Sequence, residues 1–127
     1  MALNFKLLKW AGSKSNISKK ITCHLDFERT YIEPFCGSAV FFFENCPPRA
    51  HLNDLNQNLI DCFSWVRDAP EKVWSIYNSL PVTEHDYYSL RSRFNTCSSG
   101  IEKSALFVYL NHYCFNGIYR TNKKGEF

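Results

Sequence analysis

The chain has 127 residues, the size of one ordinary domain. Lysine and arginine outnumber aspartate and glutamate by 15 to 12, which leaves a net charge of +3, and 45% of the residues are apolar. This composition excludes intrinsic disorder, because a core can be buried. The longest apolar run, Ala105 to Leu110, is far shorter than the ~18–20 residues of a membrane span, and no signal-peptide core is present. We therefore expect a cytoplasmic protein without a membrane segment.

Cysteine spacing bears on redox state and on metal binding. Six cysteines would indicate disulfides in a secreted chain, but these lie in apolar or loop surroundings without paired spacing, so we expect them to be reduced. No Cys-x-x-Cys or His-x-x-x-His spacing occurs, and only His112 with Cys114 comes near a zinc pattern. We therefore expect no metal site. The cysteines are Cys23, Cys36, Cys46, Cys62, Cys97 and Cys114.

The first half of the chain predicts alternating strands and helices. A β-branched and aromatic run leads into a turn that contains Gly37, and Pro47-Pro48 ends the apolar helix that follows. The β-α-β-α order implies a parallel sheet with a right-handed crossover, so the predicted fold class is α/β. The expected elements are a strand at 30–32, a helix at 38–45, a strand at 50–52 and a helix at 57–66.

The second half predicts helices and then a turn. Helices are expected at 70–80, 84–94 and 101–113, and Thr83 with Asp86 forms a capping-box-like pair before the second of them. Asn116-Gly117 has the chemistry of a hairpin turn, and a basic run follows it. This half predicts a helical insertion that ends in a hairpin.

The first candidate site is the turn from Glu33 to Ser38. In a doubly wound fold, ligands bind beyond the carboxyl ends of the strands, and a glycine lets a cofactor approach the backbone. Gly37 could serve this purpose, or it could simply supply the positive φ of a tight turn. Ser38 stands where the dinucleotide fingerprint would have another glycine, so the sequence supports classical dinucleotide binding only weakly.

Asp54 is the second feature of this site. It follows the expected second strand, 54 − 37 = 17 residues after Gly37, close to the ~20-residue offset of an acidic residue that accepts hydrogen bonds from ribose hydroxyls. This pairing favours a cofactor that contains adenosine. Asp54 could instead cap the helix that begins near Gln57, which is common for Asn-Asp turns.

Two further segments carry candidate binding residues. In the segment from Leu8 to Lys14, Trp10 offers a flat face and Lys14 can pair with a carboxylate or phosphate, although a solvated loop has the same composition. In the segment from Asn111 to Lys124, aromatic residues alternate with Arg120, Lys123 and Lys124. Rings can wedge between bases while basic groups contact DNA, but a hairpin with a solvated basic end is the plainer interpretation.

Taken together and in this order, the segments resemble the Dam-type DNA adenine methyltransferases. The matching blocks are Leu8 to Lys14, Tyr31-Ile32-Glu33-Pro34-Phe35-Cys36-Gly37-Ser38-Ala39-Val40-Phe41, Leu52-Asn53-Asp54-Leu55-Asn56, and Leu110-Asn111 with Tyr113, Phe115-Asn116-Gly117, Arg120 and Lys123-Lys124-Gly125-Glu126-Phe127. This resemblance implies a Rossmann-like fold that binds S-adenosylmethionine, with a helical DNA-recognition insertion, and transfer of its methyl group to adenine in duplex DNA.

The resemblance also implies roles for single residues. Asp54 is expected to bind the ribose, and the turn from Glu33 to Gly37 is expected to surround the methionine and sugar portions of the cofactor. At the DNA, Phe115 would wedge between bases, Asn116 would hold phosphate and Arg120 would read guanine. A target such as GATC is implied. The implied cofactor residues are Trp10, Gly12, Lys14, Glu33, Pro34, Phe35, Gly37 and Asp54. The implied DNA residues are Lys9, Phe115, Asn116, Ile118, Arg120 and Lys123.

The sequence departs from this family in its catalytic motif. The family holds the flipped adenine with an Asp-Pro-Pro-Tyr block, and the Pro47-Pro48 pair lacks both the acid and the aromatic residue. We therefore expect no catalytic residue in this chain. We expect residues 1–69 to form the N-terminal part of the cofactor-binding domain and residues 70–127 to form a truncated recognition region. Such a fragment would work with a complementing C-terminal half, or it would be an inactive remnant that binds S-adenosylmethionine or DNA.

Overall fold

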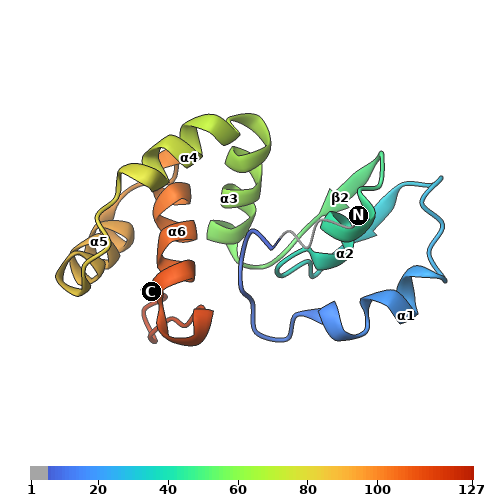
Figure 1. Cartoon of the computed structure of the whole chain (residues 1–127), viewed down its shortest axis with the longest axis horizontal. Coiled ribbons are helices and arrows are strands. Elements are labelled where there is room, and N and C mark those ends of the chain that lie inside the picture. Colours follow the sequence, from blue (N-terminus) through green and yellow to red (C-terminus); the bar gives the residue numbers. More distant parts are fainter. Residues whose placement is uncertain (1–5) are drawn as a thin grey trace. The chain divides into compact units, whose positions relative to one another are not determined.

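A computed structural model describes residues 6–127 and divides the chain into two compact units (Figure 1). The first unit extends to Leu55 and the second begins at Asn56. The helix that begins at Gln57 belongs to the second unit because it packs against other helices there. The functional division after residue 69 that the sequence predicted stays a prediction.

The first unit is built around a parallel pair of strands, as the sequence predicted. Within the described residues these two strands form a sheet by themselves, with Tyr31 opposite Ala50 and Glu33 opposite Leu52. A short 3-10 helix and a helix that the sequence had not indicated come before the strands. The elements in order are η1 Lys14–Asn16, α1 Ser18–Thr22, β1 Tyr31–Glu33, α2 Val40–Asn45 and β2 Ala50–Leu52.

The turn between β1 and α2 is tighter than the sequence indicated. Gly37 and Ala39 both have positive φ angles, of 50° and 51°, so α2 begins at Val40 rather than at Ser38. Such a conformation costs an L-residue about 1–2 kcal/mol, and Ala39 is fully buried there. At the other end, Cys46 closes α2 in the left-handed conformation and the two prolines follow, which confirms the expected helix end.

The second unit contains four α-helices in its described residues, with α6 in the middle (Figure 1). The apolar run predicted to be a helix is buried along its length from Ser104 to Asn111, and α6 packs against each of the other three helices. All four predicted helices are confirmed, with shifts of at most two residues at their ends. They are α3 Gln57–Asp68, α4 Pro70–Ser79, α5 Glu84–Thr96 and α6 Ile101–Tyr113.

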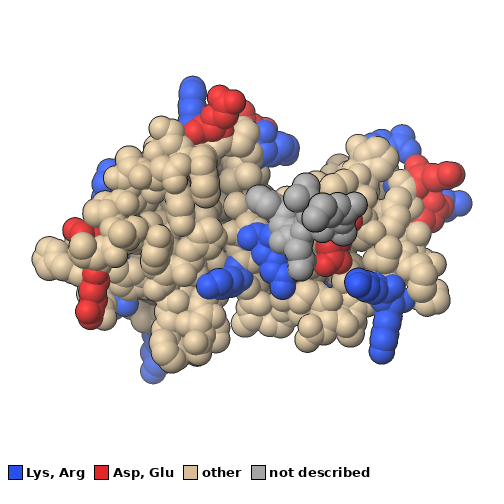
Figure 2. All heavy atoms as spheres, viewed as in Figure 1, with Lys and Arg blue, Asp and Glu red and all other residues tan. Residues whose placement is uncertain are grey.

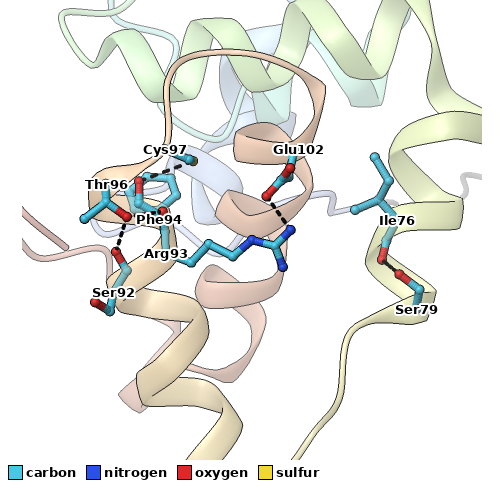
Figure 3. A network of polar contacts seen from close by, with 8 residues as sticks. All are labelled: Ile76, Ser79, Ser92, Arg93, Phe94, Thr96, Cys97 and Glu102. Carbon is cyan, nitrogen blue, oxygen red and sulfur yellow. Dashed lines mark hydrogen bonds and ion pairs between the residues drawn. The ribbon is translucent and has the colours of Figure 1, made fainter.

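Side chains at the helix ends fix these bounds. The Asn56 side chain accepts a hydrogen bond from the Leu59 amide at 3.2 Å and caps α3, and Thr83 accepts one from the Asp86 amide at 3.2 Å and caps α5. An ion pair between Arg93 and Glu102, 2.6 Å apart, joins α5 to α6 (Figure 3). The predicted capping pair at Thr83 is thereby confirmed.

The predicted hairpin is wrong, although its turn is present. Asn116 and Gly117 have φ angles of 55° and 63°, and the Ile118 amide donates to the Phe115 carbonyl at 3.3 Å, as in a type I′ turn. The residues that flank this turn belong to no strand. Instead, the Phe127 ring packs on Phe94 and its amide donates to Asn95 at 2.8 Å, because burial of this ring against α5 replaces strand pairing.

The described residues therefore form a mixed, helix-rich structure with a small parallel sheet, consistent with the predicted α/β class. Among them, no helix combines the length and the apolar character that crossing a membrane would take. All six cysteines are free thiols.

Candidate cofactor-binding site

A cavity of about 140 Å³ lies in the first unit beyond the carboxyl ends of β1 and β2. Its walls come from the segment that begins at Trp10, the turn after β1 and the residue two positions after β2. Predicted cofactor residues that line it are Trp10, Gly12, Lys14, Glu33, Phe35, Gly37 and Asp54. Pro34 belongs to the same turn but does not line the cavity. Three segments separated in the sequence thus meet at one site.

Asp54 joins the two strand ends. Its Oδ2 atom accepts a hydrogen bond from the Gly37 amide at 3.0 Å. Backbone bonds alongside it continue the parallel pairing, because the Asn53 amide donates to the Glu33 carbonyl at 2.9 Å and the Cys36 amide to the Asn53 carbonyl at 2.8 Å. The alternative that Asp54 caps the following helix is wrong, since Asn56 does so.

Gly37 is needed here for two reasons. The first reason is its positive φ angle, which favours glycine. The second is steric, because a Cβ atom at this position would lie 2.9 Å from the Cδ1 atom of the Trp10 indole ring, which is too close. The hydroxyl groups of Ser13 and Ser38, 3.3 Å apart, make a second link between these segments. The segment that begins at Trp10 is therefore attached to the turn after β1 by packing and by a hydrogen bond.

Glu33 places a carboxylate in the cavity wall. The side chain is 8% exposed, and Tyr31, on the same face of β1, donates a hydrogen bond from its hydroxyl to Oε2 at 2.9 Å. Burial raises the pKa of Glu33 above its ordinary value, while the Tyr31 hydrogen bond and the positive charge of Lys14 oppose this shift. The carboxylate is therefore held in a fixed position and partly desolvated.

The environment of the neighbouring Cys36 thiol favours its protonated form. Burial, together with the negative charges of Asp54 and Glu33, raises its pKa to about 12. Among residues 6–127, no group of three or more histidine, cysteine and acidic side chains is placed to hold a metal ion. The site offers two carboxylates, one ammonium group and an indole ring, which suits a polar organic ligand that carries hydroxyl and charged groups.

Sequence reasoning assigned no role of their own to Tyr31 and Ser13, and it included Cys36 only as part of the turn after the first strand. Tyr31 orients Glu33, and Ser13 and Cys36 line the cavity. The period of two along a strand could have revealed Tyr31, because residues 31 and 33 share a face. The contact between Ser13 and Ser38 has no such signal in the sequence.

The residues expected to contact DNA are distributed over both units. Lys9 is exposed in the first unit, while Phe115, Asn116, Arg120 and Lys123 are exposed in the second and Ile118 is half-buried. Phe115, 80% exposed, stands at the tip of the type I′ turn. On the face seen in Figure 2, acidic and basic side chains are interspersed, in line with the modest net charge of +3.

Asn122, which the sequence did not single out, organises the basic loop after this turn. Its side-chain oxygen accepts hydrogen bonds from the amides of Lys124 at 2.8 Å and Glu126 at 3.1 Å. Its backbone amide donates to the Glu126 carbonyl at 2.9 Å. The loop therefore presents Lys123 and Lys124 from a closed turn.

Comparison with known proteins identifies the family. The D12 class of N6 adenine-specific DNA methyltransferases matches residues 10–127, which include both the cavity and the type I′ turn. The chain belongs to this family. Transfer of a methyl group requires a donor, so a protein of this family needs a methyl-donating cofactor and a DNA substrate.

Individual relatives agree with this assignment. Proteins named DNA adenine methylase from Salmonella typhi and from Escherichia coli K12 are 35% and 34% identical to this chain over 131 residues, and one from Serratia marcescens is 34% identical over 135 residues. Each alignment covers 100% of this chain and 47–48% of the relative. The chain thus spans about half the length of the curated relatives it matches.

Glu33→Gln is expected to stabilise the first unit at neutral pH. Because the folded-state pKa of Glu33 lies above its ordinary value of 4.5, the folded unit binds this proton more tightly, and stability is lost as the pH rises through the interval between the two pKa values. Glutamine removes that cost and keeps an acceptor for Tyr31. Urea denaturation at pH 7 should show a higher free energy of unfolding for the variant, with the gain absent below pH 4.5.

The matched control is Glu28→Gln, an exposed position on the same unit that should change little at either pH. A Glu33→Gln variant no more stable than the parent at pH 7 would show that burial does not dominate the environment of this carboxylate.

Proposed function

We propose that this chain forms the cofactor-binding and target-recognition part of a site-specific DNA adenine N6-methyltransferase, with S-adenosylmethionine as the methyl donor. The observation that carries the proposal is the hydrogen bond between Asp54 and Gly37, which brings an acidic side chain and a glycine turn together beyond the ends of two parallel strands. This is the place where Rossmann-like folds bind adenosine-containing cofactors.

The residues present fit the chemistry of this cofactor. Asp54 would accept hydrogen bonds from the ribose hydroxyls, and Glu33 and Lys14 carry the charges that complement an α-ammonium and a carboxylate. Trp10 offers a flat ring, and Phe35, 72% exposed, extends the apolar wall. When bound, the cofactor supplies an electrophilic methyl group, and these residues hold and orient it.

The cavity has room for part of the cofactor. Its volume of about 140 Å³ is below the ~300–1,000 Å³ typical of sites that enclose a whole small ligand. We infer that the first unit supplies one side of the site and that the remaining contacts, together with the group that binds the target amine, come from a complementing C-terminal half. The proposal accordingly assigns no catalytic residue to this chain.

The second unit would recognise DNA. Phe115 would insert between base pairs from the exposed tip of the turn, with Asn116 on phosphate, Ile118 against bases and Arg120 on guanine in the major groove. Lys9 and Lys123 would add phosphate or base contacts. A target such as GATC, and the division into a cofactor region at 1–69 and a recognition region at 70–127, belong to the same proposal.

An inactive remnant that binds S-adenosylmethionine or DNA without chemistry is the second candidate. The small cavity and the lack of an Asp-Pro-Pro-Tyr run in the sequence favour it for this chain by itself. Methyl transfer from labelled cofactor to a GATC duplex by the purified chain, above the background without protein, would exclude it.

Asp54→Asn tests the cofactor site. Asparagine still accepts from the Gly37 amide but loses the charge that strengthens hydrogen bonds to ribose hydroxyls, so calorimetry should show S-adenosylmethionine binding weakened by about tenfold or more. Asp26→Asn, an exposed position of the same unit, is the control and should bind like the parent. No binding by the parent chain, or equal binding by Asp54→Asn, would contradict the proposal.

Arg120→Ala tests the reading of DNA. If Arg120 contacts guanine with two hydrogen bonds, its loss should weaken binding to a GATC duplex by ~1–3 kcal/mol and leave binding to a scrambled duplex nearly unchanged. Lys123 is proposed to contact phosphate, so Lys123→Ala should weaken binding to both duplexes by the same factor. Fluorescence anisotropy at fixed ionic strength measures all six affinities, those of the parent and the two variants for each duplex. An equal loss of affinity for both duplexes on Arg120→Ala would make Arg120 a phosphate contact instead.

A further inference from the structure

A larger cavity, of about 440 Å³, lies in the second unit between the beginning of α5 and the end of α6. Five of its lining residues are aromatic: Tyr87, Tyr88, Tyr109, Tyr113 and Phe115. We propose that this aromatic groove binds one unstacked nucleotide of single-stranded DNA, with the base on the rings and the adjoining phosphate on Arg91. The inference rests on the proposed function only in that Phe115, at its rim, belongs to the turn proposed to enter DNA.

The rings of the groove are available for stacking. Tyr88 is 53% exposed, Tyr113 is 49% exposed and Phe115 is 80% exposed, values far from those of core residues. The rings are nevertheless held in place: Tyr109 and Tyr113 lie 4.7 Å apart between centroids, and the Tyr109 hydroxyl donates to the Pro81 carbonyl at 2.7 Å. Exposed but ordered aromatic rings are the usual platform for unpaired bases.

Arg91 supplies the positive charge. Its guanidinium carbon lies 5.1 Å from the centre of the Tyr88 ring, and its charge opposes the rise in the pKa of Tyr87 that burial causes. Three other arginines of the described residues pair with carboxylates: Arg29 with Asp26, Arg67 with Asp68, and Arg93 with Glu102 (Figure 3). Among the described residues Arg91 has no carboxylate partner, so its charge stays available for an anion while the guanidinium lies over the Tyr88 ring.

The size and charge of the groove limit what it accepts. Its volume suits a single nucleotide, and a paired base inside a duplex cannot offer its faces to side chains because its neighbours cover them. Glu84 lines the same groove and repels a phosphate. Its carboxylate therefore opposes phosphate binding at its own side of the groove and leaves Arg91 as the cationic group for the phosphate.

The test uses three probes without a GATC sequence and without cofactor: fluorescent oligo(dT), a strand of equal length made of abasic sites, and a duplex. Anisotropy with the full chain should show oligo(dT) bound about tenfold more tightly than the abasic strand, because only the former can stack. Tyr88→Ala should abolish this difference, and Tyr88→Phe, which keeps a ring, should preserve it.

The charged residues give a second, independent readout. Arg91→Ala should lower the affinity for both single strands by the same factor and reduce the salt slope of binding by about 1. Glu84→Gln should raise the affinity for both strands. Trp74→Ala and Arg67→Ala are matched controls, an exposed ring and an exposed arginine of the same unit outside the groove, and should bind like the parent.

Equal affinity for oligo(dT) and the abasic strand, or a Tyr88→Ala variant that keeps the difference, would overturn the inference. Such a result would leave the proposed function intact if Arg120 still distinguished GATC from scrambled duplex. Conversely, a failure of the Arg120 test with a positive oligo(dT) result would leave the groove as a single-strand site and remove the duplex proposal.

Discussion

The hydrogen bond from the Gly37 amide to Asp54 is the contact on which the first unit depends. Two strands of three residues are too short to be stable by themselves, and this bond continues their pairing beyond the sheet. It also holds a turn in which Gly37 and Ala39 both adopt positive φ. Backbone strain of this kind persists where the surroundings fix it, and it is typical of ligand sites. One carboxylate thus stabilises the turn and shapes the cavity.

The second unit is stabilised in a different way. The apolar helix α6 is buried by three other helices, and the aromatic residues that follow it return to the same helices, as Tyr119 does on Phe107 with ring centres 5.3 Å apart. This packing leaves Phe115 and the basic loop exposed on a firm support. In the aromatic groove next to them, the Tyr88, Tyr113 and Phe115 rings are exposed, and Tyr109 belongs to the core. A surface of this kind suits nucleic acid because bases stack on rings while phosphates pair with arginine.

Local signals in the sequence predicted the elements well. The strand at Ala50–Leu52 and the helix at Ile101–Tyr113 have the predicted bounds, because a proline pair and Gly100 delimit them. The spacing between Gly37 and Asp54 predicted that the two residues lie close together. Only the structure shows that Asn56 rather than Asp54 caps α3. The hairpin failed because an Asn-Gly turn forms locally, whereas flanking strands depend on what the chain packs against, here Phe127 on Phe94. The same tertiary dependence hid the hydrogen bond between Tyr31 and Glu33.

We propose that three separate segments form one side of a cofactor site. Nuclear magnetic resonance of the ¹⁵N-labelled chain tests this arrangement directly during titration with S-adenosylmethionine. We expect the amide signals of Gly12, Gly37 and Asp54 to shift together, with a single dissociation constant. Shifts confined to one of these segments, or signals unmoved by a saturating concentration of cofactor, would contradict it.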